Sequence, residues 1–240
     1  MADWYQKESE EALRELHSGK DGLTDEEVSK RREQYGFNEL KEKKKESVFQ
    51  VFLSQFKDLM VIILIIAATI SMLTGDAEST LVIFAVLVLN AVLGTVQHVK
   101  AEKSLEALKA LSSPTAKVIR NGERVEVESR EVVPGDIFVA EAGDLIVADG
   151  RILENYSLQV NESSLTGESL NVDKSDGTLS GDLPLADRKN MVYSGSLVTY
   201  GRAVILVTET GMQTEIGKIA ALMNQTGEKK TPLQKNLDDF

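Results

Sequence analysis

The tetrapeptide Thr166-Gly167-Glu168-Ser169 contains the side chains of this sequence that are best suited to chemistry. It lies after a segment of β character, which places it in a loop. The glycine would let the backbone approach a phosphate closely, and Glu168 could orient a water molecule or accept its proton. The same four residues are also typical of a polar surface turn, so their interpretation depends on the rest of the chain.

The composition excludes most other chemistries. The 240 residues include no cysteine, and the two histidines are far apart, which excludes disulfides, thiolate catalysis, Cys-ligated zinc and a histidine metal cluster. A net charge of −11 disfavours nucleic acid as a partner. Walker, dinucleotide-binding, zinc-protease and Ser/His/Asp motifs are also missing from the sequence. Carboxylate and hydroxyl chemistry remains.

Two uncharged segments, residues 59–75 and 79–99, predict a pair of membrane helices separated by the acidic connector Asp76-Ala77-Glu78. At 1.5 Å per residue they would be about 25 Å and about 31 Å long, against a hydrocarbon thickness of about 30 Å. A buried helical hairpin of a soluble protein is the alternative, because segments of this length can also form a core. Their near-spanning length favours the membrane.

The segment before the first uncharged run is mostly apolar as well. We therefore expect one long helix over residues 47–75, partly interfacial and then inserted, with Ser47 and Gln50 as its capping box. The second helix is expected over residues 79–112. It continues past the membrane as a cytoplasmic stalk, because its apolar residues keep to one face beyond the uncharged run.

Lysines flank the two membrane helices, whereas the connector between them has no Lys or Arg. By the positive-inside rule, both flanks should be cytoplasmic, and with them both termini of the chain. The chain is therefore expected to be an integral membrane protein with the lipid bilayer as a partner. The flanking lysines are Lys41, Lys43, Lys44 and Lys45 before the first helix, and Lys100, Lys103 and Lys109 after the second.

Residues 1–46 are charged throughout and predict a cytoplasmic helical segment rather than a signal peptide. One helix is expected over Ser9–Leu16. A second should begin at Thr24, whose spacing from Glu27 is that of a capping box, and end at Gly36.

From residue 113 to about residue 225, short β segments alternate with turns rich in Gly, Pro and Asp. Asn121-Gly122 is typical of a tight hairpin turn between the first two strands. A helix over residues 214–223 should end this domain. The expected strands are residues 117–120, 124–127, 137–140, 145–147, 151–153, 158–160, 192–198 and 203–208.

These patterns predict a mixed fold. A two-helix transmembrane hairpin and a helical amino-terminal segment accompany an all-β distorted jelly-roll or barrel with a trailing helix. The expected parts are residues 1–46 (amino-terminal segment), 47–75 and 79–112 (membrane helices and stalk), 113–225 (β domain) and 226–240 (a linker toward a third membrane helix, where the chain is cut).

Short motifs in a fixed order then run along the chain. They are Gly22-Leu23-Thr24, Tyr35-Gly36-Phe37-Asn38-Glu39-Leu40, Gln55-Phe56-Lys57-Asp58-Leu59, Asn90-Ala91 with Gly94, Val133-Pro134-Gly135-Asp136, Gly143-Asp144 with Ala148-Asp149, Asn161 through Ser169, Ser194-Gly195, and Thr214 through Ile219. In this order they resemble the amino-terminal part of the P-type cation-transporting ATPases, through the actuator domain, over essentially the whole chain.

The resemblance implies a role for each residue of the tetrapeptide. Glu168 would position and activate water against an aspartyl phosphate formed on another domain of the same polypeptide. Its loop would be the working tip of the actuator domain. Thr166 and Gly167 would shape that tip, and Ser169 would brace it.

Two nearby positions also bear on the resemblance. Lys174 matches a basic residue that commonly follows the tetrapeptide in this family. Asn171 stands where many members carry proline, a departure that affects the stiffness of the loop rather than its chemistry.

The family's phosphorylated aspartate lies in an Asp-Lys-Thr-Gly-Thr motif that this sequence lacks. The resemblance therefore implies that the phosphorylation and nucleotide-binding domains follow Phe240 as partners on the same polypeptide. Mg²⁺ and ATP would bind there, outside this chain, and this chain itself would hold no metal or cofactor. The full-length protein would be an ion-translocating ATP hydrolase, and this chain alone should be inactive.

The transported cation is the remaining partner. The run from residue 55 to residue 68 looks closest to the calcium-pump branch, and the cell membrane of a prokaryote is the expected location. Another cation (Na⁺, K⁺ or H⁺) is the first alternative, and a non-catalytic membrane-anchored β module that binds a partner is the second. Asn90, Gln97 and Asp58 are polar residues in or beside the membrane helices, with a place on the ion path, helix–helix contact or capping as alternative roles.

Overall fold

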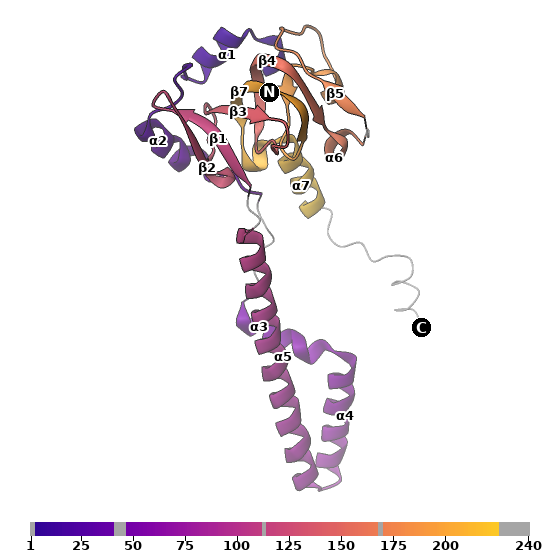
Figure 1. Ribbon diagram of the computed structural model, residues 1–240. Helices are drawn as coiled ribbons and strands as arrows, with labels where there is room; N and C mark the ends of the chain where they lie inside the picture. Colours follow the sequence, from indigo (N-terminus) through magenta and orange to yellow (C-terminus); the bar gives the residue numbers. More distant parts are fainter. Residues whose placement is uncertain (1–2, 41–46, 112–113, 168–169, 226–240) are drawn as a thin grey trace. The chain divides into compact units, whose positions relative to one another are not determined.

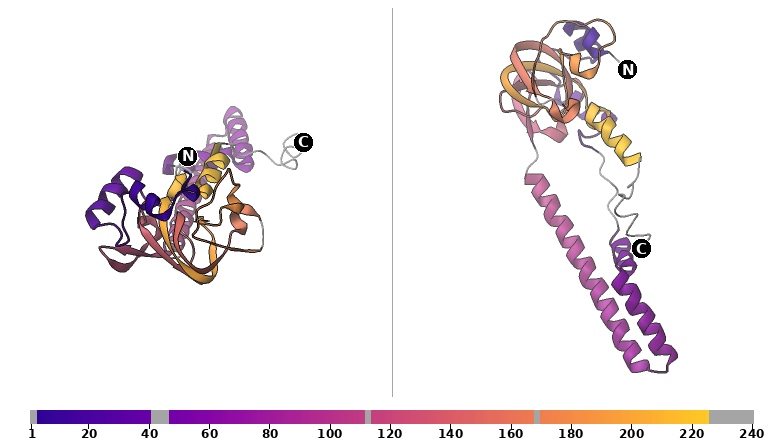
Figure 2. Two further views of the ribbon diagram at one scale, coloured as in Figure 1. Left: turned by 90° about the horizontal axis from the view of Figure 1, so that it is seen from above. Right: turned by 90° about the vertical axis from the view of Figure 1, so that its right-hand side faces the viewer.

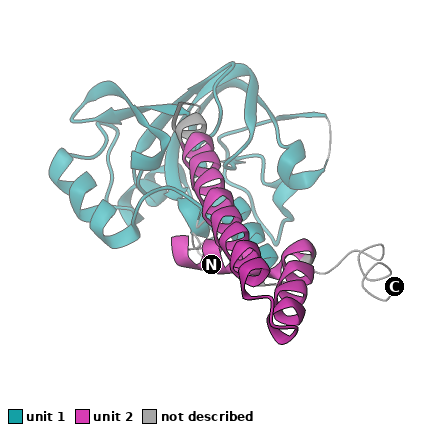
Figure 3. Cartoon of the chain, turned by 90° about the horizontal axis from the view of Figure 1, so that it is seen from below, with its two compact units in different colours: residues 1–41, 114–240 teal, residues 42–113 magenta. Residues whose placement is uncertain are grey.

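The computed structural model describes residues 3–40, 47–111, 114–167 and 170–225. The chain forms two compact units (Figure 3). The first combines Met1–Lys41 with Pro114–Phe240, and the second is Glu42–Ser113. The expected linker, residues 226–240, lies outside the described residues.

The amino-terminal part of the first unit consists of the 3-10 helix η1 (Trp4–Gln6) and the helices α1 (Ser9–Glu15) and α2 (Asp25–Tyr35). The predicted capping box at the start of α2 is confirmed: the Thr24 hydroxyl accepts from the Glu27 amide, and the Glu27 carboxylate accepts from the Thr24 amide. Gly36 ends the helix with φ +79°, a conformation that favours glycine.

The β domain is an antiparallel sheet with the strand order β2-β1-β3-β7-β4-β5, and β6 also pairs with β4 (Figure 1). The predicted hairpin turn is confirmed, since Asn121 and Gly122 both have positive φ, +51° and +78°. The strands are β1 (Thr115–Arg120), β2 (Glu123–Glu128), β3 (Ile137–Glu141), β4 (Asp149–Asn161), β5 (Asn171–Asp173), β6 (Met191–Val192) and β7 (Leu197–Glu209). The other short elements are η3 (Ser129–Glu131), α6 (Ser163–Thr166), η4 (Leu185–Asp187), η5 (Gly211–Gln213) and the trailing helix α7 (Glu215–Gln225).

Several predicted strand boundaries are wrong. The predicted strands 151–153 and 158–160 are one strand, β4, and β7 continues through the expected break at Gly201. The reason is a pair of facing irregularities, because Ser157 (φ +55°) and Gly201 (φ +75°) let both strands bend without ending. A Cβ on Gly201 would lie 2.2 Å from the Ser157 carbonyl oxygen, so only glycine fits there.

Two other predicted strands are not strands over their full length. Residues 145–147 make only an isolated bridge, Leu145 to Leu197. The predicted strand 192–198 is divided into β6 and the start of β7 by the turn at residues 193–196, where the Ser196 amide donates to the Tyr193 carbonyl. Most of their apolar residues, such as Ile146 and Val192, are buried by tertiary packing, which the alternation pattern cannot distinguish from strand pairing.

The sheet buries apolar side chains on both faces. Phe138 and Ile205 lie in the central core cluster, whereas their neighbours Ile137 and Leu206 point to the opposite face. That opposite face is covered by side chains of η1 and α1, including Trp4. The amino-terminal segment is therefore part of the fold of the β domain.

Buried polar side chains attach this segment at its backbone. The Asn190 side-chain amide donates to the Tyr5 carbonyl at 2.8 Å. The Arg151 guanidinium, which is fully buried, donates to the carbonyls of Lys7 at 3.3 Å and Asp176 at 3.0 Å. Burial lowers the pKa of Arg151 to about 10, and its charge is distributed over backbone carbonyls.

The second unit contains α3 (Val48–Ser54), η2 (Gln55–Lys57), α4 (Leu59–Leu73) and α5 (Ala77–Leu111). The expected single helix over residues 47–75 is wrong, because the chain bends by 70° between Val48–Lys57 and Met60–Leu73. The cause is Asp58, whose extended backbone interrupts the helix and whose carboxylate accepts from the Met60 amide at 2.9 Å as an N-cap. The predicted capping box of Ser47 and Gln50 is confirmed at α3.

Helices α4 and α5 lie side by side and antiparallel, joined by a short turn (Figures 1 and 2). The contact face of α5 carries Leu87, Ala91 and Thr95, which are buried at helical spacing. Most of the remaining apolar side chains of both helices are exposed. By length and composition, one helix of the described residues, Ala77–Glu106, could cross a membrane, and the bent pair α3–α4 could form a second span.

Candidate functional site

The tetrapeptide lies in the connection between two paired strands, β4 and β5. Antiparallel pairing brings Val160 opposite Val172 and Asn161 opposite Asn171, so the two ends of the connection are adjacent. The expected loop after a β strand is therefore present. It additionally contains the single helical turn α6, which ends at Thr166.

Side chains of the loop itself define this turn. The Asn161 carboxamide oxygen accepts from the Ser163 amide at 3.1 Å and from the Ser163 hydroxyl at 2.6 Å. At the other end, the Thr166 amide and hydroxyl both donate to the Glu162 carbonyl, at 3.0 Å and 3.2 Å. Thr166 thus closes the turn through two hydrogen bonds to one carbonyl.

Gly167 ends the turn in the left-handed region, with φ +77° and ψ −1°. Its amide donates to the Ser163 carbonyl at 3.0 Å, and the space where a Cβ would stand is open. The glycine is thus required by the backbone conformation rather than by crowding, and another group can approach the backbone from this side. Glu168 and Ser169 lie outside the described residues.

A buried ion pair joins the first residue of the loop to the residue that follows β5. The Lys174 ammonium lies 2.6 Å from a Glu162 carboxylate oxygen, and neither side chain has any exposed surface. Among the described residues, neither group has a hydrogen-bond partner outside the pair, although the ammonium also lies 5.7 Å from the ring centre of Tyr193. Burial raises the pKa of Glu162 and lowers the pKa of Lys174, and the opposite charge of the partner counteracts both shifts.

The turn at Ser194-Gly195 supports the other side of α6. The Ser164 hydroxyl donates to the Gly195 carbonyl at 3.5 Å. Gly195 has φ +85°, and a Cβ there would lie 2.9 Å from the Cδ1 atom of Ile216. The Gly195 amide donates to the Ile146 carbonyl at 2.8 Å, which fixes this turn to the core.

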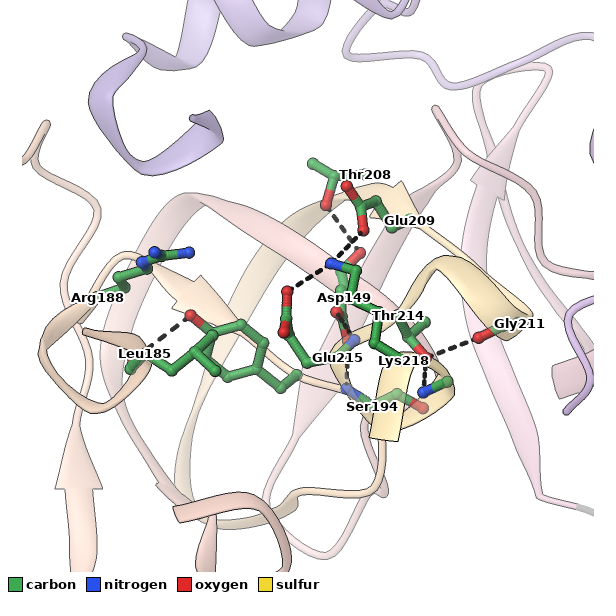
Figure 4. A network of polar contacts seen from close by, with 12 residues as sticks. Asp149, Leu185, Arg188, Ser194, Thr208, Glu209, Gly211, Thr214, Glu215 and Lys218 are labelled. Atoms are coloured by element: carbon green, nitrogen blue, oxygen red, sulfur yellow. Dashed lines mark hydrogen bonds and ion pairs between the residues drawn. The ribbon is translucent and has the colours of Figure 1, made fainter. Parts of the chain in front are cut away.

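Asp149 connects this turn to helix α7 (Figure 4). Its two carboxylate oxygens accept from the Ser194 amide and from the Glu215 amide, each at 2.8 Å. Burial raises the pKa of Asp149 to about 6, although these hydrogen bonds favour the charged form. The Lys218 ammonium pairs with the carboxylates of Glu215 at 2.6 Å and Glu209 at 3.3 Å, which ties the first turn of α7 to the end of β7.

The hollows of the first unit do not suit a nucleotide. The space beside Asp149, lined also by Tyr193 and Lys218, has a volume of ≈ 60 Å³, enough for a few water molecules. A groove of ≈ 420 Å³ runs between Leu40 and Ile216, but its lining has no Lys or Arg to bind phosphates. No group of three or more His, Cys, Asp or Glu side chains suited to a metal ion occurs among the described residues.

The other candidates from the sequence have separate places. Asn90 and Gln97 lie exposed on α5, and Asp58 caps α4. Asn171 opens β5, where its side-chain oxygen lies 3.5 Å from the Asn161 side-chain nitrogen. Sequence reasoning missed the pairing of Glu162 with Lys174, because only the strand register brings residues twelve positions apart together.

Comparison with known proteins identifies the first unit and the beginning of the second. Residues 110–224 match the P-type ATPase actuator domain, and residues 4–71 match the cation transporter/ATPase N-terminus. The chain is 49% identical over 236 residues to a calcium-transporting ATPase of Listeria monocytogenes and to calcium-transporting ATPase 1 of Lactococcus lactis, with 98% of this chain and 27% of each relative covered. It is 41% identical over 216 residues to a sodium/potassium exporting P-type ATPase of Schizosaccharomyces pombe, with 89% of this chain and 21% of that relative covered. The chain thus spans about a quarter of the length of the curated relatives that it matches.

Proposed function

The chain belongs to the P-type ATPases, an ion-transporting family of hydrolases, and we propose that it is the amino-terminal and actuator part of an ATP-driven calcium pump. In this proposal the loop between β4 and β5 promotes hydrolysis of an aspartyl phosphate held by another domain. The first unit then passes the resulting movement to the membrane helices.

The geometry of Thr166 and Gly167 carries this proposal. Both strands that flank the loop belong to the sheet, and the turn α6 within the loop ends in a glycine whose Cβ side is open. Such a rigid, accessible backbone turn can approach a phosphorylated carboxyl group closely. The residue that follows Gly167 in the chain is Glu168, the only acid in the tetrapeptide.

The proposed step is a hydrolysis. The Glu168 carboxylate orients a water molecule and accepts its proton while the water oxygen forms a bond to phosphorus. The bond between phosphorus and the aspartyl oxygen breaks, which releases the carboxylate and inorganic phosphate. Thr166 and Gly167 hold the loop in shape, and Ser169 braces it.

ATP and Mg²⁺ are proposed to bind outside the described residues, because these residues provide neither a metal-ligand cluster nor a hollow that suits a triphosphate. The partners are therefore the phosphorylation and nucleotide-binding domains of the same polypeptide. No step of the actuator chemistry above requires a metal held by this chain.

The second unit is proposed to be a transmembrane hairpin with α5 as one span and the bent α3–α4 pair as the other. Lysines on both flanks and none in the connector favour cytoplasmic ends. Bacterial relatives support a prokaryotic cell membrane as the location.

Calcium is proposed as the cargo because the chain is 49% identical, over 236 aligned residues, to calcium-transporting ATPases of two bacteria. Transport of Na⁺, K⁺ or H⁺ remains the alternative, and the fission-yeast relative named for sodium and potassium export is 41% identical. Calcium uptake by inverted membrane vesicles, against uptake of sodium and potassium, tests the assignment. A non-catalytic β binding module would leave both family matches unexplained.

The test of the actuator role is Glu168→Gln in the full-length pump. Because this substitution keeps the shape and removes the base, decay of radiolabelled phosphoenzyme should slow by about 10²- to 10⁴-fold, while phosphorylation from ATP persists. Glu123→Gln, the same change at an exposed position of β2, is the matched control and should decay at the parental rate. Parental decay in Glu168→Gln would refute the role.

A further inference from the structure

The start of the loop between β4 and β5 is held by an ion pair as well as by strand pairing. Glu162 directly follows β4 and is the first residue of the loop, and Lys174 directly follows β5. The 2.6 Å contact between their charged groups therefore links the start of the connection that contains Thr166 and Gly167 to the far end of β5. Among the described residues, no other ion pair has two fully buried side chains.

The backbone of Glu162 carries the turn above it. Its carbonyl accepts from the Leu165 amide at 2.9 Å, the Thr166 amide at 3.0 Å and the Thr166 hydroxyl at 3.2 Å. Any shift of Glu162 therefore moves Thr166, and with it Gly167. The side chain of Glu162 is held only by Lys174 among the described residues.

Lys174 is itself held in place. Its amide donates to the Leu158 carbonyl at 2.9 Å, and its carbonyl accepts from the Asn155 side chain at 2.7 Å. Both partners lie on β4, so the ammonium projects from a fixed backbone toward Glu162. The Lys174 backbone is thus fixed to β4, and its contact with Glu162 restrains the start of α6.

A buried ion pair of this kind contributes little to the net free energy of folding. Burial of two charges costs about as much as their attraction returns, and well-packed apolar side chains often stabilise a buried site better. A short contact between two charged groups fixes the position of one group relative to the other more specifically than an apolar contact does.

We propose that Glu162 and Lys174 are positioning residues for Glu168: their buried ion pair sets the geometry of the loop that presents this carboxylate to the aspartyl phosphate. This inference rests on the proposed function of Glu168. It adds that dephosphorylation depends on the pair, and that phosphorylation does not.

The experiment uses the full-length pump and measures decay of radiolabelled phosphoenzyme together with the thermal unfolding midpoint. Lys174→Met removes the cation and should slow the decay by about 10- to 100-fold, the effect expected of a misplacement near 1 Å. Arg120→Met is the matched control. Arg120 lies on β1, away from the loop, and the substitution breaks its buried ion pair with Asp136 (2.7 Å). It should lower the midpoint but leave the decay at the parental rate.

Two further variants separate positioning from folding. Glu162→Leu/Lys174→Met replaces both charges by apolar groups and should recover the thermal midpoint lost in Lys174→Met, but not the decay rate. Adding Lys174→Met to Glu168→Gln should slow the decay no further, because the pair acts only through Glu168.

Each other outcome overturns the inference. Parental decay in Lys174→Met, decay restored in the apolar double variant, or slowing that adds to that of Glu168→Gln would assign the pair a purely structural role. Parental decay in Glu168→Gln is a separate result, which refutes the proposed function itself and removes the basis of the inference.

Discussion

The contacts that stabilise the first unit internally differ in kind from those that stabilise the second. In the first unit, buried polar side chains bond to the backbone of distant segments, and Asn38 is the clearest case. Its side chain donates to the carbonyls of Ser129 and Val147, both at 2.9 Å, and accepts from the Gly211 amide at 2.8 Å. One amide group thereby joins three parts of the chain.

In the second unit, the side-chain hydrogen bonds of the described helices are local. Thr69 and Thr95, for example, donate to carbonyls four residues earlier in the same helix. The buried contact face of α5 is mostly apolar, and most apolar side chains of the unit are exposed. A surface like this is stable where its surroundings are apolar, as in a bilayer, so the second unit needs few polar links of its own.

The largest expected effect on stability comes from deleting the amino-terminal segment of the first unit. Residues 114–225 alone lose the cover provided by Trp4, Tyr5 and Leu13, each worth about 1.5–3 kcal/mol of burial. The loss is comparable with the whole stability of a domain, about 5–15 kcal/mol, so this segment should aggregate or unfold without cooperativity.

The matched comparison joins residues 1–40 to residue 114 through a short Gly/Ser linker. Leu40 and Pro114 line the same groove, so a short linker can replace the second unit. This protein should be soluble and melt cooperatively by circular dichroism. If residues 114–225 alone melted at the same temperature, the polar and apolar links to the amino-terminal segment would contribute nothing.

A smaller effect is expected from the titration of Asp149. Its folded pKa of about 6 exceeds the ordinary aspartate value of 3.8, so the folded state binds the proton more tightly than the unfolded chain. Its contribution to stability is therefore fully present below pH 3.8 and is lost as the pH rises through 6. The shift corresponds to about 3 kcal/mol at most.

The measurement is chemical unfolding of the linked first unit at pH 4 and at pH 7. Asp149→Asn removes the titration. The free energy of unfolding of the parent minus that of this variant should therefore be smaller at pH 7 than at pH 4. The variant also loses one acceptor for the two amides that Asp149 binds, which lowers its stability at both pH values. A constant difference would show that the pKa of Asp149 is not shifted in the fold, and a difference that rises with pH would show that folding lowers it; both results contradict the prediction.

The smallest effect is expected in the second unit, at Gly94. A Cβ there would lie 2.6 Å from the Gln55 side-chain oxygen, which can swing away, and alanine favours a helix over glycine by about 1 kcal/mol. Gly94→Ala should therefore change the thermal midpoint of the chain in detergent very little. Gly22→Ala in the first unit is the contrast, because its Cβ would lie 1.8 Å from the Ile119 carbonyl oxygen at φ +75°.

Gly22→Ala should lower the midpoint of the first unit clearly, since neither backbone can yield cheaply. Equal effects of the two substitutions would contradict this difference between the units. In the first unit the glycine lies close to backbone atoms, and in the second it lies close to the end of a side chain that can move.

Local sequence determined the elements whose cause is local. The capping box at Thr24, the glycine end of α2 and the Asn121-Gly122 turn each depend on a few neighbouring residues, and each was predictable. The position of Thr166 and Gly167 after a strand was also predictable, although Thr166 ends a helical turn there. A resemblance in the order of the motifs then led to the family.

Tertiary structure decided what depends on distant partners. Whether β4 and β7 end or bend at Ser157 and Gly201 depends on two strands facing each other. The break at Asp58 required a choice between continuing a helix and capping a new one, which the apolar pattern does not contain. The contact between Glu162 and Lys174 requires the pairing of β5 with β4, which places the Lys174 backbone beside Leu158, and no spacing along the chain specifies that pairing.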